Sequence, residues 1–214
     1  MGYNIAIDGP AGAGKSTIAK LAAKELGYVY VDTGAMYRAL AIHFLDAGIA
    51  AEEKDKIAEA CKSAEVKIKY VDQVQHVYLN DVDVTGRLRE EAVGNMASKS
   101  SSIPEVREKL LELQRTLARE EDVIMDGRDI GTNILPNADL KIYLTASTKT
   151  RADRRYKELT QQNIKCDYDE IYKYIDERDK RDMEREIAPL RQAEDAVLVD
   201  SSDMTIDEVV SEII

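Results

Sequence analysis

The chain has 214 residues, of which 44% are hydrophobic and 33% are charged, and its formal net charge is −11. This length suits one domain, or one core with a small insert, and is sufficient for a substantial hydrophobic core. The acidic balance argues against a surface that attracts nucleic acid or anionic membrane by bulk charge, because long-range repulsion would slow each encounter. We therefore expect neither nucleic acid nor a membrane as a partner.

The cysteines and the apolar segments indicate the compartment. Cys61 and Cys166 are too few for a disulfide scaffold and lack metal-ligand spacing, which favours a reducing environment. The most apolar stretch, residues 39–51, is short and is interrupted by polar residues, so it does not predict a membrane span. The first residues form a β-like run and contain no signal core. These features predict a soluble cytoplasmic protein.

Short β-type runs alternate with helical periodicity along most of the chain. Runs at residues 3–8, 28–32, 122–126, 140–145 and 196–200 predict five strands. Helices are predicted from Lys15 to a stop at Gly27, over residues 33–47, and from Pro104 onward. Five short apolar strands separated by helices imply a parallel sheet with helices on both faces.

The segment from about residue 66 to residue 85 departs from this alternation. Its three β-type runs, at 66–70, 76–79 and 82–85, are joined by a few polar residues each. Links this short permit hairpins but no helical crossover. We expect a small antiparallel sheet inserted in the α/β core and packed on it, since no Pro- or Ser-rich linker flanks the segment.

Residues 9–16, G-P-A-G-A-G-K-S, match the phosphate-loop pattern G-x-x-x-x-G-K-[ST] between a strand and a helix. The glycines let backbone N–H groups surround phosphate oxygens, and the helix N-terminus adds the positive end of its dipole. Lys15 can reach the β- and γ-phosphates, and the Ser16 hydroxyl can ligate Mg²⁺. A glycine-rich turn that only caps a helix is the alternative. The full match in this context favours nucleoside triphosphate binding.

Four of the five predicted strands end in aspartate, at Asp8, Asp32, Asp126 and Asp200. In open parallel sheets the ligand crevice lies at the carboxyl ends of the strands, where carboxylates can hold Mg²⁺ or accept from sugar hydroxyls. Aspartate is also a common turn and N-cap residue. That ordinary role is at least as well supported for Asp8 and Asp200. For Asp32, a tentative metal ligand, and for Asp126 we favour a function.

Arginines follow in three groups. Arg128 and Asp129 lie between glycines just after a strand, which suits a site, although a buried ion pair is the alternative. Helical spacing places two further sets each on one helix face: Arg151, Arg154 and Arg155; and Arg178, Arg181, Asp182 and Arg185. Both sets could be solvated faces with ion pairs. After a phosphate loop, they also suit a mobile lid whose arginines hold phosphate oxygens.

Together these motifs resemble the bacterial cytidylate kinases, a family of P-loop nucleoside monophosphate kinases, over essentially the whole chain. The matching segments are residues 9–17, D-T-G-A-M-Y-R at 32–38, Ser98, P-E-V-R at 104–107, Q-R at 114–115, D-G-R-D-I-G-T at 126–132, E-R-D-K-R-D at 177–182, Arg185 and A-P-L at 188–190. Thr33 stands where some relatives have serine, which keeps the hydroxyl.

The resemblance implies a particular architecture. It is an α/β P-loop kinase core with a five-stranded parallel sheet and helices on both faces, a small antiparallel β insert and a helical lid. We expect residues 1–214 to form a single P-loop kinase domain. Within it, residues 62–100 would be an inserted monophosphate-binding subdomain and residues 150–170, approximately, the lid.

The resemblance also implies transfer of the γ-phosphoryl group of MgATP to CMP or dCMP, in pyrimidine nucleotide metabolism, by a monomer. The implied ATP-binding residues are Gly9, Pro10, Ala11, Gly12, Ala13, Gly14, Lys15, Ser16 and Thr17. The implied catalytic residues are Lys15, Arg128, Arg154 and Arg178. The implied CMP-binding residues are Thr33, Tyr37, Arg38, Ser98, Arg107, Arg128, Asp129, Arg178, Asp182 and Arg185.

The resemblance divides the CMP-binding residues by the part of CMP that they contact. Arg38 and Arg128 would hold the acceptor phosphate, and Arg178 and Asp182 would contact the pentose. The cytosine would be read by Ser98, Arg107, Asp129 and Arg185, together with Thr33.

Elementary chemistry supports the assignment of Asp129 to the base. Cytosine presents an N4 amino donor that a carboxylate can accept, whereas uracil would place O4 against the same carboxylate. Loss of such a buried hydrogen bond costs about 1–3 kcal/mol, or roughly ten- to a hundredfold in preference.

Two other functions remain open from the residues. Another small-molecule P-loop kinase, acting on a different nucleoside monophosphate or of the shikimate type, could share the loop and the lid. The insert and residues 126–132 argue against it. A non-enzymatic nucleotide switch is the other alternative, but the N-K-x-D segment that a GTPase would use to read its base does not occur in the sequence.

Overall fold

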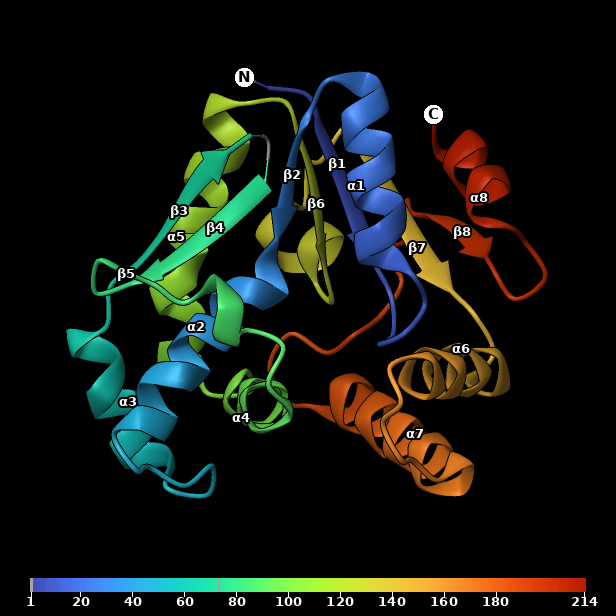
Figure 1. Ribbon diagram of the computed structural model, residues 1–214. Coiled ribbons are helices and arrows are strands. Elements are labelled where there is room, and N and C mark those ends of the chain that lie inside the picture. Colours follow the sequence, from blue (N-terminus) through green and yellow to red (C-terminus); the bar gives the residue numbers. More distant parts are fainter. Residues whose placement is uncertain (1, 73) are drawn as a thin grey trace. The chain divides into compact units, whose positions relative to one another are not determined.

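The computed structural model describes residues 2–72 and 74–214 (Figure 1). In chain order, its elements up to the middle of the chain are β1 (Asn4–Asp8), α1 (Lys15–Leu26), β2 (Val29–Asp32), α2 (Thr33–Asp46), α3 (Lys54–Ser63), β3 (Val66–Val71), β4 (Val74–Leu79), β5 (Val82–Asp83), the 3-10 turn η1 (Thr85–Arg87) and α4 (Glu91–Ser100). The remaining elements are α5 (Pro104–Glu120), β6 (Val123–Gly127), the π-helical turn η2 (Ile130–Ile134), β7 (Leu140–Thr145), α6 (Thr148–Gln161), α7 (Tyr168–Glu184), β8 (Val197–Asp200) and α8 (Ile206–Ile213).

The five predicted strands form one parallel sheet with the strand order β2-β6-β1-β7-β8. Parallel registers pair Ile7 with Ile142 and Leu144 with Val199. Strands β1 and β6 have nearly continuous buried runs, and Ile7 and Ile124 are each 0% exposed. A strand that is covered on both faces needs apolar residues at successive positions, which explains why these strands lack alternation. The prediction of a parallel α/β sheet is confirmed.

The inserted antiparallel sheet is also confirmed, with the strand order β3-β4-β5. Its registers pair Val66 with Leu79 and Leu79 with Val82. The hydroxyl of Tyr70 donates to the backbone carbonyl of Tyr30 at 3.0 Å, so a side chain of this small sheet holds the strand β2.

The helix that follows the phosphate loop ends where its sequence predicts. Ile18 and Ala22 are buried on one side of α1, and full burial of an isoleucine side chain stabilises the fold by about 1.5–3 kcal/mol. Gly27 has φ 74°, and its N–H donates to the carbonyl of Ala23, which closes the helix. This left-handed conformation costs little only for glycine.

By its internal contacts the chain divides into two compact units. Of the described residues, one unit comprises residues 2–3 and 29–123, and the other comprises Asn4–Tyr28 with Ile124–Ile214. In the first unit α2 packs beside α4, and in the second α6 packs beside α7 (Figure 1). Across the described part of the chain, no helix has both the length and the apolar character of a membrane span.

Candidate active site

The phosphate loop leaves strand β1 at a position that only glycine can occupy. A Cβ atom on Gly9 would lie 1.9 Å from the backbone oxygen of Leu144 in strand β7. At the other end of the loop, Gly14 has φ 93° and is the N-cap of α1. The backbone therefore requires glycine at Gly9 for close approach and at Gly14 for a left-handed conformation.

The side chain of Lys15 is buried inside this loop. Its Nζ donates to the backbone oxygen of Pro10 at 2.8 Å, and the residue is 5% exposed. Burial, and then the neighbouring charge of Arg128, lower the pKa of Lys15 to about 7, although Asp126 opposes the shift. Because little water reaches this position, the charged ammonium group is poorly solvated, and a bound anion would stabilise it.

Ser16 and Asp126 bring two oxygen donors together at the start of α1. The Ser16 hydroxyl donates to Asp126 Oδ2 at 3.0 Å, and Asp126 is buried at the end of strand β6. Hydroxyl and carboxylate oxygens are the ligands that Mg²⁺ takes from proteins that bind it with a nucleotide. The position of Asp126 at the end of a predicted strand favours a function, and this contact places the carboxylate beside the phosphate loop.

Asp8 and Asp200 satisfy backbone groups near them. The two oxygens of Asp8 accept from the N–H groups of Ile130 and Gly131, each at 2.8 Å, so this carboxylate holds the first turn of η2. Burial raises the pKa of Asp8 to about 6, partly offset by these two hydrogen bonds. Asp200 accepts from the N–H and hydroxyl of Ser202. Both carboxylates therefore accept hydrogen bonds from turn residues, which is the ordinary structural role that the sequence left open for Asp8 and Asp200.

The segment after strand β6 presents two arginine–carboxylate pairs. Arg128 Nε donates to Asp182 Oδ2 at 2.8 Å, and Arg185 Nη2 donates to Asp129 Oδ1 at 3.1 Å. The second oxygen of Asp129 accepts from Asn133 Nδ2 at 3.1 Å. Burial opposes ionisation of Asp182, but the guanidinium of Arg128 lowers the pKa of that carboxyl below its usual value. Residues predicted to bind the acceptor therefore meet in pairs.

The two helices predicted to carry lid arginines are α6 and α7. Arg151 is buried among backbone carbonyls, and Arg154 Nη2 donates to the backbone oxygen of Ser201 at 2.6 Å. Only Arg155 has the solvated arrangement, with a surface ion pair to Glu158 at 2.8 Å. The face formed by these three arginines is thus divided between structural contacts and solvent.

The other unit carries the remaining predicted acceptor residues. Asp32 is the N-cap of α2, where its Oδ1 accepts from the N–H of Ala35 at 2.9 Å, and its Oδ2 lies 3.8 Å from Arg38 Nη1. The guanidinium of Arg107 lies over the ring of Tyr37, 5.8 Å from the ring centroid. Thr33 is buried at the first turn of α2, and Ser98 is half-buried on α4.

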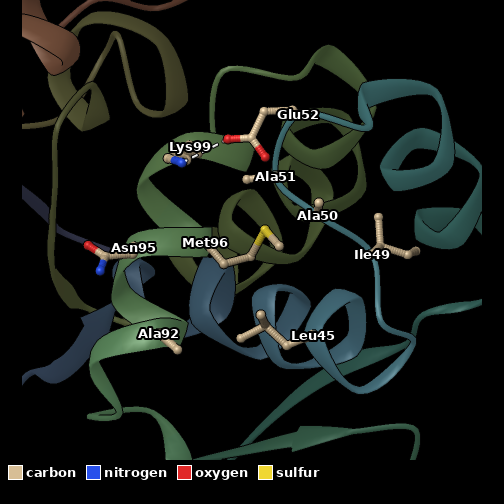
Figure 2. A pocket seen from close by; sticks show the side chains of 9 residues that line it. All are labelled: Leu45, Ile49, Ala50, Ala51, Glu52, Ala92, Asn95, Met96 and Lys99. Carbon is tan, nitrogen blue, oxygen red and sulfur yellow. Dashed lines mark hydrogen bonds and ion pairs between the residues drawn. The ribbon is translucent and has the colours of Figure 1, made fainter.

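A cavity in the same unit lies apart from these side chains. It has a volume of about 230 Å³ between the end of α2 and α4, and Figure 2 shows the residues that line it, with the ion pair of Lys99 and Glu52 (2.9 Å) at its rim. None of the predicted site residues lines it. Separately, no group of three or more His, Cys, Asp or Glu residues in the described chain could hold a metal alone.

Sequence reasoning missed several side chains that hold the site. Gln75 of β4 pairs with both backbone polar groups of Asp32, at 2.8 Å and 3.1 Å. Ser201 follows strand β8, and its hydroxyl lies 3.3 Å from the carbonyl oxygen of Ala13. No sequence motif marks either residue, because each acts through backbone atoms distant in sequence.

A parallel α/β sheet whose first strand leads through a glycine loop with a buried lysine into a helix defines a P-loop nucleotide-binding protein. The family model described as cytidylate kinase matches residues 5–214, and the chain belongs to this family. This membership disfavours the two alternatives, another P-loop kinase and a nucleotide switch.

Named relatives agree over nearly the whole length. The chain is 51% identical to a cytidylate kinase of Caldicellulosiruptor bescii over 99% of this chain and 93% of the relative. It is 50% identical to a cytidylate kinase of Exiguobacterium sp. over 98% of this chain and 93% of the relative. Among solved structures, an uncharacterized protein from Eubacterium ventriosum matches with a TM-score of 0.54 at 13% identity, over 99% of this chain and 95% of that one, and shares the fold.

Proposed function

We propose that this protein is an ATP-dependent kinase that transfers the γ-phosphoryl group of ATP to CMP or dCMP and releases CDP or dCDP with ADP. Membership of the cytidylate kinase family supports the reaction. The single observation that supports a cytosine nucleotide as the phosphate acceptor is the buried carboxylate of Asp129, which Arg185 and Asn133 hold in one orientation. A cytosine N4 amino group can donate to such an acceptor, and uracil O4 cannot.

ATP is proposed to bind with its phosphates in the loop of residues 9–17. Lys15 would exchange the carbonyl of Pro10 for phosphate oxygens, which offer its ammonium group a full counter-charge. Mg²⁺ fits the oxygen donors here, with Ser16 as its protein ligand and Asp126 beside it. Bound there, Mg²⁺ would neutralise developing charge on the transferring phosphoryl group. Asp32, whose side chain caps α2, is the weaker candidate for this position.

The acceptor residues are proposed to divide by the part of CMP that they contact. Arg38 and Arg128 would hold the acceptor phosphate, and Arg178 and Asp182 would contact the pentose. The base would be read by Asp129 and Arg185 together with Thr33, Ser98 and Arg107, while Tyr37 supports Arg107 from below. Arg128 would then change partners from Asp182 to phosphate, which a guanidinium fork binds with two oxygens at once.

No general base is required, because the acceptor phosphate is already an anion. Catalysis is proposed to come from in-line positioning and from neutralisation of charge by Lys15, Arg128, Arg154 and Arg178. In the structure the guanidinium of Arg154 contacts Ser201, so this residue would have to leave that contact to reach a phosphate. Closure of the lid would exclude water and suppress wasteful hydrolysis of ATP.

We propose that different segments of the chain have different roles. Residues 1–214 would act as one P-loop kinase domain, residues 62–100 as the monophosphate-binding insert, and residues 150–170, approximately, as the lid. We further propose that the protein works as a monomer in pyrimidine nucleotide metabolism in the cytoplasm, where ATP and CMP are both present.

One panel assay tests the function. ADP production is measured with MgATP and each of CMP, dCMP, UMP, AMP and shikimate. We expect CMP and dCMP to give the highest kcat/KM. A preference for AMP or shikimate, or a slow hydrolysis that no acceptor changes, would overturn the proposal.

A further inference from the structure

Three backbone carbonyls of the phosphate loop accept hydrogen bonds from side chains. Pro10 accepts from Lys15 within the loop itself. The other two donors come from elsewhere in the chain. Arg151 Nη1 donates to the oxygen of Ala11 at 3.0 Å. Ser201 Oγ lies 3.3 Å from the oxygen of Ala13 and 3.0 Å from that of Thr145, and these two oxygens share its single hydrogen. The shape of the loop therefore depends on partners that lie outside the motif.

Arg151 is the more completely engaged of the two outside donors. Its Nε donates to the oxygen of Ala146 at 2.9 Å, and its Nη2 donates to Thr148 Oγ1 at 3.1 Å. The same Nη2 lies 2.6 Å from Asp179 Oδ2 on α7, and the residue is 4% exposed. Each of the three guanidinium nitrogens thus has an acceptor from the protein.

The stem of Arg151 also contacts the loop. A Cβ atom built on Gly12 would lie 3.4 Å from Arg151 Cβ and 3.7 Å from its Cγ, so the arginine packs directly on this glycine. Hydrogen bonding at Ala11 and packing at Gly12 fix two successive residues of the loop against the start of α6.

We propose that Arg151 is a positioning residue that ties the phosphate loop to the helix pair α6–α7, and that it does not act as a phosphate ligand. The tie runs from the Ala11 carbonyl through the guanidinium to Asp179. The inference rests on the proposed function only in taking ATP as the ligand of the loop. It assigns Arg151 a role different from that of an arginine that grips the transferring phosphate.

The link between Arg151 and α7 depends on the carboxylate of Asp179. Its Oδ2 is paired with Arg151, and within the described part of the chain its buried Oδ1 has no hydrogen-bond partner. The carboxylate is therefore held chiefly by the arginine. Because α6 and α7 pack side by side, a shift of α7 would act on the arginine and through it on the loop.

The two possible roles of Arg151 differ in what Asp179 does. If the arginine positions the loop, Asp179→Asn should weaken nucleotide binding although Asp179 never meets the nucleotide. The double variant with Arg151→Lys should then be no weaker than the worse single variant, because both changes break one tie. If the arginine binds phosphate directly, Asp179→Asn should leave binding almost unchanged.

The experiment measures the dissociation constants of MgATP and of metal-free ADP by calorimetry for the wild type, Arg151→Lys, Asp179→Asn and the double variant. Arg155→Lys is the matched control, since Arg155 lies on the same helix in a surface ion pair. Each single variant is expected to weaken binding by about tenfold, with no further loss in the double variant. The control is expected to bind as the wild type does.

Hydrogen exchange of the peptide covering residues 9–14, in the protein without nucleotide, gives an independent readout. Arg151→Lys and Asp179→Asn should both speed exchange there, while the control does not. This measurement needs neither ATP nor CMP, so it separates failure of the tie from failure of the proposed function. If Arg151→Lys does not fold, Asp179→Asn alone decides the question. Wild-type ATP affinity and loop exchange in a folded Asp179→Asn variant would overturn the proposal.

Discussion

Asp129 and Arg185 form a buried ion pair, with Arg185 Nη2 donating to Asp129 Oδ1 at 3.1 Å and both side chains 6% exposed. Because Asn133 occupies the other oxygen, the carboxylate is held at both ends before any ligand arrives. A carboxylate oxygen has a second lone pair, so either oxygen can also accept from a ligand amine. The Asp129 carboxylate, which would distinguish cytosine from uracil, therefore needs no reorientation when CMP binds.

Replacing Asp129 with asparagine is expected to lower the ratio of kcat/KM for CMP to that for UMP by about ten- to a hundredfold. An amide can donate to uracil O4 as well as accept from cytosine N4, so the discrimination of the carboxylate is lost. Asn133→Ala is the control, because it removes a partner of Asp129 but keeps the carboxylate. A ratio that is the same in Asp129→Asn and the wild type would rule out base reading by this residue.

Replacing Lys15 with methionine is expected to lower kcat by at least about 10²-fold without lowering thermal stability. Burial lowers the pKa of Lys15 to about 7, which means that the folded protein disfavours the charged side chain. An apolar side chain of similar length removes the cost of burying a charge, which offsets the loss of the hydrogen bond from Lys15 to Pro10, while phosphoryl transfer loses its cation. The measurements are the turnover with CMP and the melting temperature. Near-normal turnover in a folded variant would contradict the mechanism.

The carboxyl of Asp8 predicts a pH dependence of stability. Its pKa of about 6 in the folded chain, raised by burial, exceeds the ordinary value of 3.8. The folded state holds this proton more tightly, so the contribution of Asp8 to stability is full below pH 3.8 and is lost as the pH rises through 6. A shift of this size corresponds to about 3 kcal/mol.

Urea unfolding of the wild type and Asp8→Asn between pH 4 and 7.5 tests this expectation. The free energy of unfolding of the wild type, relative to the variant, should decrease across that range by up to about 3 kcal/mol. Asp200→Asn is the control, since hydrogen bonds from Ser202 lower the pKa of Asp200 and move its titration below this range. A difference between wild type and Asp8→Asn that stays constant with pH would refute the raised pKa.

The parallel core could be predicted from the sequence because its signals are local. Strand β1, the phosphate loop and the start of α1 are contiguous, and the stop at Gly27 has a known backbone cause. The antiparallel insert was predictable for the same reason, since the links between its strands are too short for a crossover.

The supporting contacts of the site could not be predicted in this way. The π-helical turn η2 has no periodic pattern, and it forms where both oxygens of Asp8 receive N–H groups that lie more than 120 residues later in the chain. Arg151 likewise meets Ala11 across 140 residues. Helical spacing predicts that this arginine lies on one face of a lid helix. Only the folded chain shows that its guanidinium is bound by backbone carbonyls and by Asp179.

Gln75 holds the backbone of Asp32 through both polar atoms of its amide. Its Oε1 accepts from the N–H of Asp32 at 2.8 Å and its Nε2 donates to the carbonyl of Asp32 at 3.1 Å, as a neighbouring strand would. Asp32 is the N-cap of α2, the helix that carries Thr33 and Arg38, so Gln75 holds the entry to proposed acceptor contacts. Gln75→Glu keeps the acceptor but replaces the donor with a second oxygen that faces the Asp32 carbonyl.

We expect Gln75→Glu to raise the KM for CMP by about three- to tenfold and to leave the KM for ATP unchanged, since one of two hydrogen bonds is replaced by a repulsive contact. Tyr70→Phe serves as the control, because it removes a hydrogen bond between the same small sheet and β2, at Tyr30, two residues before Asp32. It should have the smaller effect on the KM for CMP. Equal effects of the two substitutions would mean that the sheet holds β2 as a whole, and the specific role of Gln75 at Asp32 would be wrong.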